Sequence, residues 1–111
     1  MPKINRLTRK KDFGTVFKKG ESLKNNFLVF KILKNYLKKS RFGFIVSKKV
    51  STKAVVRNKI KRRLRVAVFK ELHNIKNHAD IIIITLPEIK KKKFSEIQNV
   101  INDSFGKIGI F

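Results

Sequence analysis

The first half of the chain contains two short, mostly apolar stretches in which every second residue would point to the same side. Residues 27–33 and residues 42–47 are rich in β-branched and aromatic types, and the alternation gathers the larger side chains on one side of each stretch. This period of two is typical of β-strands. A polar turn over residues 35–40 separates them, so we predict that the two strands form a hairpin.

A helical spacing precedes these strands, at residues 9–19. Phe13 and Phe17 are four positions apart and therefore share one face of the predicted helix. Thr8 is a suitable cap for the first turn, and Gly20 is placed to end the helix.

The second half of the chain predicts a long helix, a central strand and a final helix. Residues 57–72 carry an apolar stripe at the spacing i, i+4, i+7, i+8. Residues 81–86 are apolar on both faces, which is typical of a central strand, and Pro87 stops it. The capping-box pattern of residues 95–98 opens a last helix, and Gly106 closes it.

The resulting order of elements is αββαβα. It predicts an α/β fold, an α+β sandwich in which helices cover a mixed sheet of about four strands. We also consider a short extra strand near residues 50–55. The chain has 111 residues, 41% of them hydrophobic, and shows no repeat or linker, so we expect one domain over residues 1–111.

The charge of the chain indicates the kind of partner that it binds. There are 29 Lys and Arg residues against 7 Asp and Glu residues, which gives a formal net charge of +22 and a pI near 10.9. So much positive charge repels itself and attracts phosphate backbones, whose counterions are released on binding. A surface merely solubilised by lysine is the alternative, but a pI above about 9 is typical of nucleic-acid-binding domains. We therefore expect a nucleic-acid partner.

Membranes and oxidising compartments fit this sequence poorly. The longest aliphatic run, residues 81–84, is far shorter than the roughly 18 residues of a membrane span. Cysteine is absent, which excludes disulfides and thiolate metal sites. The first residues lack the apolar stretch of a signal peptide. We expect a soluble, cytoplasmic protein without a membrane partner.

The densest cluster of functional side chains lies in the predicted long helix. At about 100° per residue, five polar residues fall within an arc of about 140° beside the apolar stripe. They are Arg57, Asn58, Lys61, Arg62 and Arg65. A guanidinium group can hold a phosphate through two hydrogen bonds, and an amide can bond sugar or base edges. The alternative is an ordinary solvated face, but like charges on neighbouring turns repel, and a phosphate partner removes that repulsion.

Independent catalysis is poorly supported by the acidic residues. The seven carboxylates are scattered and lack the spacing of a two-metal phosphodiesterase site, and His73 and His78 lie in a polar connection. We therefore predict no catalytic residue and no metal ligand in the chain. Two alternatives to an accessory RNA-binding subunit are considered, a ribosomal-type structural RNA-binding protein and, third, a protein-only nuclease.

Four segments resemble the protein subunit of bacterial ribonuclease P, and the resemblance covers nearly the whole chain. They are DFGTVFKKG at residues 12–20, VSKKV at 46–50, AVVRNKIKRRLR at 54–65 and DIIII at 80–84. Lys59 departs from the family pattern, which usually has the second Arg of an Arg-Asn-Arg triplet at this place. The loop over residues 51–53 is slightly longer than usual.

The resemblance implies a fold and a function that composition alone does not show. The fold contains a left-handed βαβ crossover, whereas the general rule favours the right-handed form. The five-residue basic face docks on the catalytic RNA, and Mg²⁺ bound mainly by that RNA supports the hydrolysis. The substrate is precursor transfer RNA, from which the enzyme removes the 5′ leader, and no protein partner is required.

The resemblance also implies a cleft for the single-stranded leader, between the first helix and the sheet. Its lining is Phe13, Phe17, Leu28 and Phe30, with Lys48 and Lys49 beside it. Aromatic rings accept any base by stacking, while cations follow the backbone. The alternative for Phe13 and Phe17 is a place in the hydrophobic core.

Overall fold

The computed structural model describes residues 2–111. Its helices are α1 (Lys10–Lys19), α2 (Ala54–Glu71) and α3 (Phe94–Ile108), and its strands are β1 (Glu21–Asn25), β2 (Leu28–Lys34), β3 (Arg41–Ile45) and β4 (Ala79–Thr85). Short 3-10 turns form η1 (Lys3–Asn5), η2 (Leu72–Asn74) and η3 (Pro87–Lys91). The predicted α/β class is confirmed. The observed order, αβββαβα, differs from the predicted order by one additional strand, β1, which was not predicted from the sequence.

The four strands form one mixed sheet in the order β1-β2-β4-β3. β2 is antiparallel to β1 and β4, whereas β3 is parallel to β4. The predicted hairpin between residues 27–33 and residues 42–47 is therefore wrong. β2 instead turns back on β1 through Asn26, whose φ of 55° is a conformation that Asn tolerates in tight turns. β1 shows no apolar alternation because it is an edge strand with mostly exposed residues.

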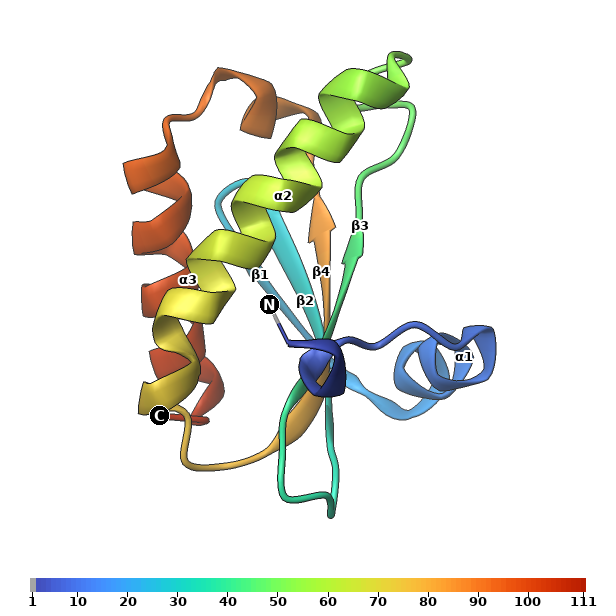
Figure 1. Cartoon of the computed structure of the whole chain (residues 1–111), viewed down its shortest axis with the longest axis vertical. Helices are drawn as coiled ribbons and strands as arrows, with labels where there is room; N and C mark the ends of the chain where they lie inside the picture. Colours follow the sequence, from blue (N-terminus) through green and yellow to red (C-terminus); the bar gives the residue numbers. More distant parts are fainter. Residues whose placement is uncertain (1) are drawn as a thin grey trace.

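The connection from β3 through α2 to β4 is a left-handed crossover. With α2 toward the viewer and both strands running upward, β4 lies to the left of β3 (Figure 1). The resemblance implied this handedness, which nearly all parallel βαβ units avoid. In the strand order β3 is an edge strand, and the N-terminal segment covers its free edge, where the N–H of Leu7 donates to the carbonyl of Phe42 at 2.8 Å.

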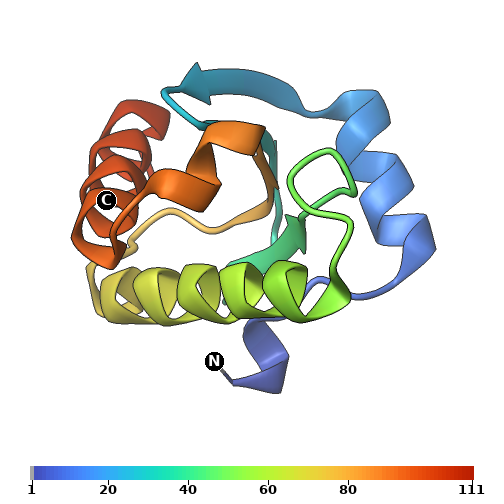
Figure 2. The ribbon, with the colours of Figure 1, turned by 90° about the horizontal axis from the view of Figure 1, so that it is seen from above.

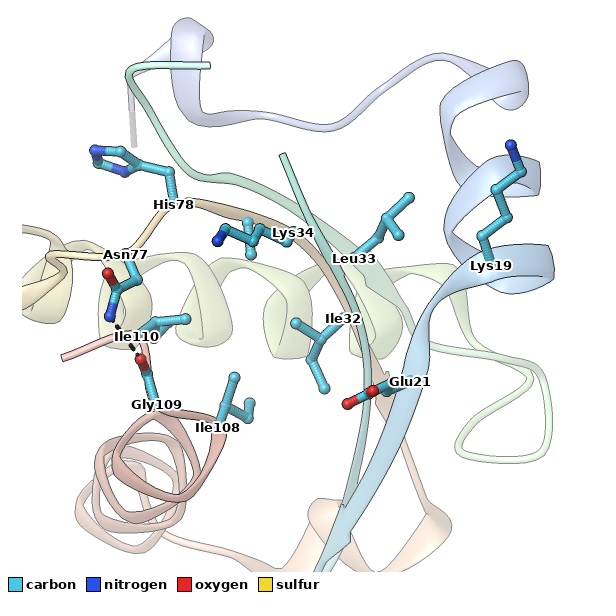
Figure 3. A pocket seen from close by; sticks show the side chains of 11 residues that line it. Lys19, Glu21, Ile32, Leu33, Lys34, Asn77, His78, Ile108, Gly109 and Ile110 are labelled. Atoms are coloured by element: carbon cyan, nitrogen blue, oxygen red, sulfur yellow. Dashed lines mark hydrogen bonds between the residues drawn. The ribbon is translucent and has the colours of Figure 1, made fainter. Parts of the chain in front are cut away.

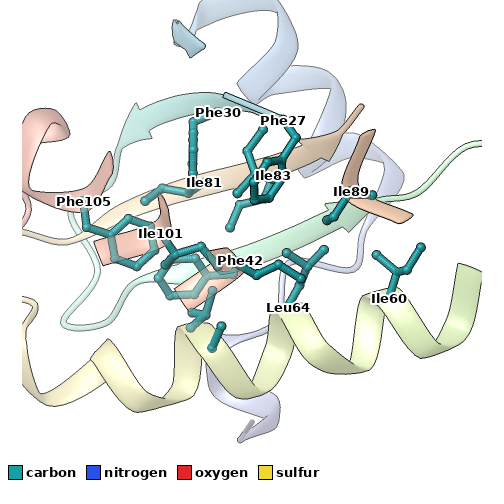
Figure 4. Close-up of a cluster of buried hydrophobic side chains, with 14 of the residues drawn as sticks. Phe27, Phe30, Phe42, Ile60, Leu64, Ile81, Ile83, Ile89, Ile101 and Phe105 are labelled. Carbon is teal, nitrogen blue, oxygen red and sulfur yellow. The ribbon is translucent and has the colours of Figure 1, made fainter. Parts of the chain in front are cut away.

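Helices cover the two faces of the sheet unequally. α2 and α3 pack on one face, and α1 packs on the other (Figure 2). The main core lies beneath α2 and α3 and includes Phe30, Phe42, Leu64, Ile83 and Phe105 (Figure 4). A smaller cluster of Leu7, Val16 and Ile82 lies beneath α1, with Phe13 packed against it.

The register of β2 against β4 decides which side of β2 faces which helices, because directly paired residues share a face. Phe30 pairs with Ile83, a member of the main core. Val29 pairs with Ile84, which packs against the smaller cluster. The aromatic side of β2 therefore faces α2 and α3, and the side with Val29 faces α1.

Two helices begin elsewhere than predicted. α2 starts at Ala54 rather than at residue 57, and residues 50–55 form no strand. The β-branched residues at its start obscure a helix in the sequence. Thr8 does not cap α1, because Arg9 is the N-cap residue and makes no side-chain cap hydrogen bond.

The last helix is also longer than predicted. Its N-cap is Lys93 rather than Ser95, and the carboxylate of Glu96 accepts a hydrogen bond from the Lys93 N–H at 3.3 Å. The helix continues past Gly106 and ends at Gly109, whose φ of 86° lies in the left-handed region that glycine readily adopts.

Arg41 ties the start of α1 to the sheet. Its guanidinium group donates to the carboxylate of Asp80 at 2.8 and 2.6 Å and reaches the carboxylate of Asp12, in α1, at 3.4 Å. The hydrogen bonds to Asp80 raise the pKa of Arg41. A charged contact therefore reinforces the apolar packing that holds α1 in place.

Polar contacts also join the other elements. The carboxylate of Glu71, at the end of α2, is buried and accepts hydrogen bonds from Gln98 and Asn102 of α3 at 3.0 and 3.2 Å. At the far end of α3, hydrogen bonds from Asn25 and then Lys107 lower the pKa of the exposed Asp103 carboxyl. Among residues 2–111, no helix has the length and apolar character needed to cross a membrane.

Candidate nucleic-acid interface

The five residues of the predicted basic face all lie on α2. Asn58 and Arg62 are exposed, and Arg57, Lys61 and Arg65 are half-buried. Within residues 2–111, none of the five forms an ion pair with a carboxylate. The cationic face is therefore accessible and is not neutralised by the chain's own acids.

Two of these cations are held in place by the surrounding structure. The guanidinium group of Arg57 donates to the carbonyl of Ser51 at 2.9 Å, which fixes it beside the loop that precedes α2. The guanidinium carbon of Arg65 lies 6.0 Å from the centroid of the Phe44 ring, within the range of a cation–π contact. Such restraint lowers the entropy lost when a side chain binds a phosphate.

A small pocket of about 190 Å³ connects α2 with α1 across strand β3. Lys61 and Arg65 line one side of it, and Phe13 of α1 and Arg6 of the N-terminal segment line other parts. The structure therefore brings the basic face of α2 close to a residue of the predicted leader cleft.

Four lysines surround a second pocket, of about 410 Å³, at the start of α2. Lys48, Lys49 and Lys53 come from the loop between β3 and α2, and Lys90 comes from η3. Lys48 and Lys49 were predicted as RNA contacts, whereas Lys53 and Lys90 were not. The lysine run at residues 90–93 was visible in the sequence, but only the folded chain places its first member beside the loop.

Leu28 and Phe30 do not line a cleft against α1, and this part of the prediction is corrected. Both side chains are 0% exposed in the main core. The Phe30 ring meets Phe105 of α3 edge to face, with 6.2 Å between centroids. The physical reason is the pairing of β2 with β4, which puts the shared side of Leu28 and Phe30 on the sheet face covered by α2 and α3, away from α1.

Phe13 and Phe17 have different surroundings although they share α1. Phe13 is half-buried, and its ring packs against Gly43 in β3, where a Cβ would clash with it. Phe17 is 43% exposed. Of the apolar residues predicted for the cleft, Phe17 is the most accessible.

On the sheet face that α1 covers, several half-buried side chains were not predicted as site residues. Ile45 and Ile84 pack against the smaller cluster, and Val29 lies opposite Ile84 in the register. The sequence pattern of β2 does not identify Val29 as a site residue, because the larger side chains of Leu28 and Phe30 lie on the opposite side of the strand.

A larger pocket, of about 540 Å³, lies away from all these residues, between the end of α1 and the end of α3 (Figure 3). Lys19, Lys34 and His78 contribute to its lining together with Ile32 and Ile110. It contains none of the predicted site residues. Within residues 2–111, no group of three or more His, Asp or Glu side chains is arranged to hold a metal ion.

The basic face of α2, without carboxylate partners on a chain of net charge +22, is typical of a nucleic-acid-binding protein. The family model described as ribonuclease P matches residues 1–109, and the chain belongs to the ribonuclease P protein family. Members of this family are subunits of an RNA-based endoribonuclease that processes transfer RNA. The predicted family is confirmed.

Curated relatives and solved structures match this chain over nearly its full length. The ribonuclease P protein components of Clostridium acetobutylicum and Bacillus pumilus are 36% and 34% identical, over 97% and 100% of this chain and 92% and 93% of theirs. The structure is similar to the RNase P protein of Staphylococcus aureus, with a TM-score of 0.85, 33% identity and coverage of 96% of this chain and 97% of that one. For the RNase P protein of Thermotoga maritima the TM-score is 0.84, at 29% identity and with 92% and 96% coverage.

Proposed function

We propose that the chain binds the catalytic RNA of ribonuclease P through the basic face of α2 and assists Mg²⁺-dependent removal of the 5′ leader from precursor transfer RNA. The observation that carries the proposal is the accessible face of Arg57, Asn58, Lys61, Arg62 and Arg65, which has no carboxylate partner within residues 2–111. With a net charge of +22, the chain neutralises phosphates and lets two RNA molecules approach each other.

The leader lies, in this proposal, on the α1 side of the sheet beside Phe17. An exposed ring supports this placement, because base stacking needs an accessible aromatic face. Val29 and Ile84 supply half-buried apolar surface on the same face of the sheet. Phe13 supports the site by packing α1 against Gly43.

The pocket formed by Lys48, Lys49, Lys53 and Lys90 supplies contacts to RNA phosphates. Four cations around one pocket repel one another, and a phosphate removes that repulsion. The pocket lies at the start of α2, so it extends the row of cations on that helix toward η3.

Hydrolysis is assigned to the catalytic RNA and its bound Mg²⁺. Several carboxylates of the chain are already engaged with cations: Asp12 and Asp80 with Arg41, Asp103 with Lys107, and Glu96 with Lys92. The contribution of the protein is therefore to bind and position two RNA molecules.

A reconstitution assay tests the proposal. Purified chain, catalytic RNA and labelled precursor transfer RNA are combined at low Mg²⁺, and leader removal is expected only when both protein and RNA are present. A ribosomal-type structural protein would bind RNA without stimulating cleavage. Cleavage by the RNA-free chain that is lost on substitution of an Asp or Glu would instead support a protein-only nuclease.

Two triple variants with equal loss of charge provide a matched control. Replacing Arg57, Arg62 and Arg65 with glutamine should abolish the stimulation, because it removes three cations from the basic face. Replacing Lys59, Arg63 and Lys70 with glutamine removes three cations from another side of α2 and should leave most of it. Equal loss of activity in both variants would mean that only total charge matters, and would contradict the assignment of the face.

A further inference from the structure

Phe69 is a large apolar side chain exposed on the basic helix. It is 50% exposed, near the C-terminal end of α2. It follows Arg62 by seven positions and Arg65 by four. At about 100° per residue, the direction of Phe69 about the helix axis falls between those of Arg62 and Arg65, within the same arc as the rest of the basic face.

The Phe69 ring is also without an aromatic or cationic partner in the part of the chain that is described. Two other rings near α2 are already engaged: Phe44 has the guanidinium group of Arg65 at 6.0 Å, and Phe94 has the ammonium group of Lys70 at 5.0 Å. The face of the Phe69 ring is therefore available to a partner outside the chain.

The charge around Phe69 selects the kind of partner. The one carboxylate of α2, on Glu71, is buried and bonded to amides of α3, so it does not reach the exposed face. Val66, which is 45% exposed, precedes Phe69 by three positions on α2, and Arg65 and Arg62 lie on the same side of the helix about one and two turns before it. An apolar group carried by a polyanion fits this surface, and a nucleobase is such a group.

We propose that Phe69 stacks on an unpaired base of the catalytic RNA and so extends the interface of α2 beyond its cations. This inference rests on the proposed docking of α2 on that RNA. The distance along the helix axis from Arg57 to Phe69 is about 18 Å, at about 1.5 Å per residue. The helix then contacts phosphates along most of this length and a base at its C-terminal end.

Binding of the catalytic RNA by single variants tests this role. Phe69→Ala is expected to weaken binding by roughly 5- to 150-fold, the range found for loss of one stacked base. Phe69→Tyr should bind like the parent because it retains the ring, whereas Phe69→Leu should bind like Phe69→Ala. The slope of log affinity against log salt should not change, because no phosphate contact is lost.

Two comparisons keep the outcomes distinct. Arg62→Ala should weaken binding and flatten the salt slope; if it does and Phe69→Ala binds like the parent, the docking of α2 stands and the stacking role is wrong. If Phe69→Leu binds like the parent, the contact is a general apolar one and stacking is also wrong. Thermal melts accompany each variant. Should Phe69→Ala unfold, the difference in RNA affinity between Phe69→Leu and Phe69→Tyr tests the stacking role instead.

Discussion

Replacing Phe30 with alanine should unfold the protein at a much lower temperature, although the resemblance implied an RNA contact for this residue. The Phe30 ring is 0% exposed and packs against Phe105. Removing a buried Phe ring costs about 3–5 kcal/mol. For a domain of 111 residues, the entropy of unfolding at a reference temperature of about 60 °C is about 0.23 kcal/mol/K. The Tm should therefore fall by roughly 13 to 21 °C.

Phe17→Ala should behave differently because the ring is 43% exposed. Full burial of a Phe side chain stabilises the folded state by about 1.5–3 kcal/mol. Because a little over half of the Phe17 side chain is buried, its removal should cost about 1–2 kcal/mol of the free energy of unfolding. The corresponding fall in Tm is roughly 4 to 9 °C. In the holoenzyme, this variant should bind a precursor with a long leader roughly 5- to 150-fold more weakly and bind a leaderless transfer RNA normally.

Thermal melts at one salt and protein concentration come first, followed by binding of both substrates to the reconstituted holoenzyme. The reasoning from burial would be refuted if Phe30→Ala melted within about 4 °C of the parent and selectively lost affinity for the long leader. If Phe17→Ala bound both substrates with unchanged relative affinity, the proposed position of the leader beside α1 would be wrong.

Three further predictions concern charged side chains. Arg62→Ala should reduce the magnitude of the log–log salt slope for binding the catalytic RNA by about 0.7 to 0.9; Arg63→Ala, one residue along on another side of α2, should leave it unchanged. Arg41→Ala should lower the free energy of unfolding in urea by about 3 kcal/mol, since it leaves a buried carboxylate without its cation; a loss below about 1 kcal/mol would show that the pair contributes little. The hydrogen bond from Asn25 lowers the pKa of the Asp103 carboxyl, so its stabilisation is present above about pH 4 and is lost as the pH falls through the lower folded-state value. Melts of Asp103→Asn and the parent should therefore differ near neutral pH and converge in acid.

The sequence by itself determined the class of fold, the family and the basic face of α2. These features depend on short-range patterns: the period of two in β2 and β3, the continuous apolar run of β4, the helical spacing of α2, and the position of each cation relative to the apolar stripe of its own helix. Helical spacing alone places Arg57, Lys61, Arg62 and Arg65 on one face of α2, independently of how α2 packs in the tertiary structure. The segments that resemble the family are likewise continuous in the chain.

Only the tertiary structure decided the order of the strands and the side of the sheet on which α1 lies. Alternation in β2 shows that Leu28 and Phe30 share a side, but it does not show which helices cover that side. Pairing with β4 placed both residues in the main core, where Phe30 packs against Phe105, and left Phe17 on the other face of the sheet. Lys90 came beside the loop before α2 in the same way, through a contact between segments far apart in the chain. Contacts of this kind depend on how the elements pack, and local periodicity does not encode them.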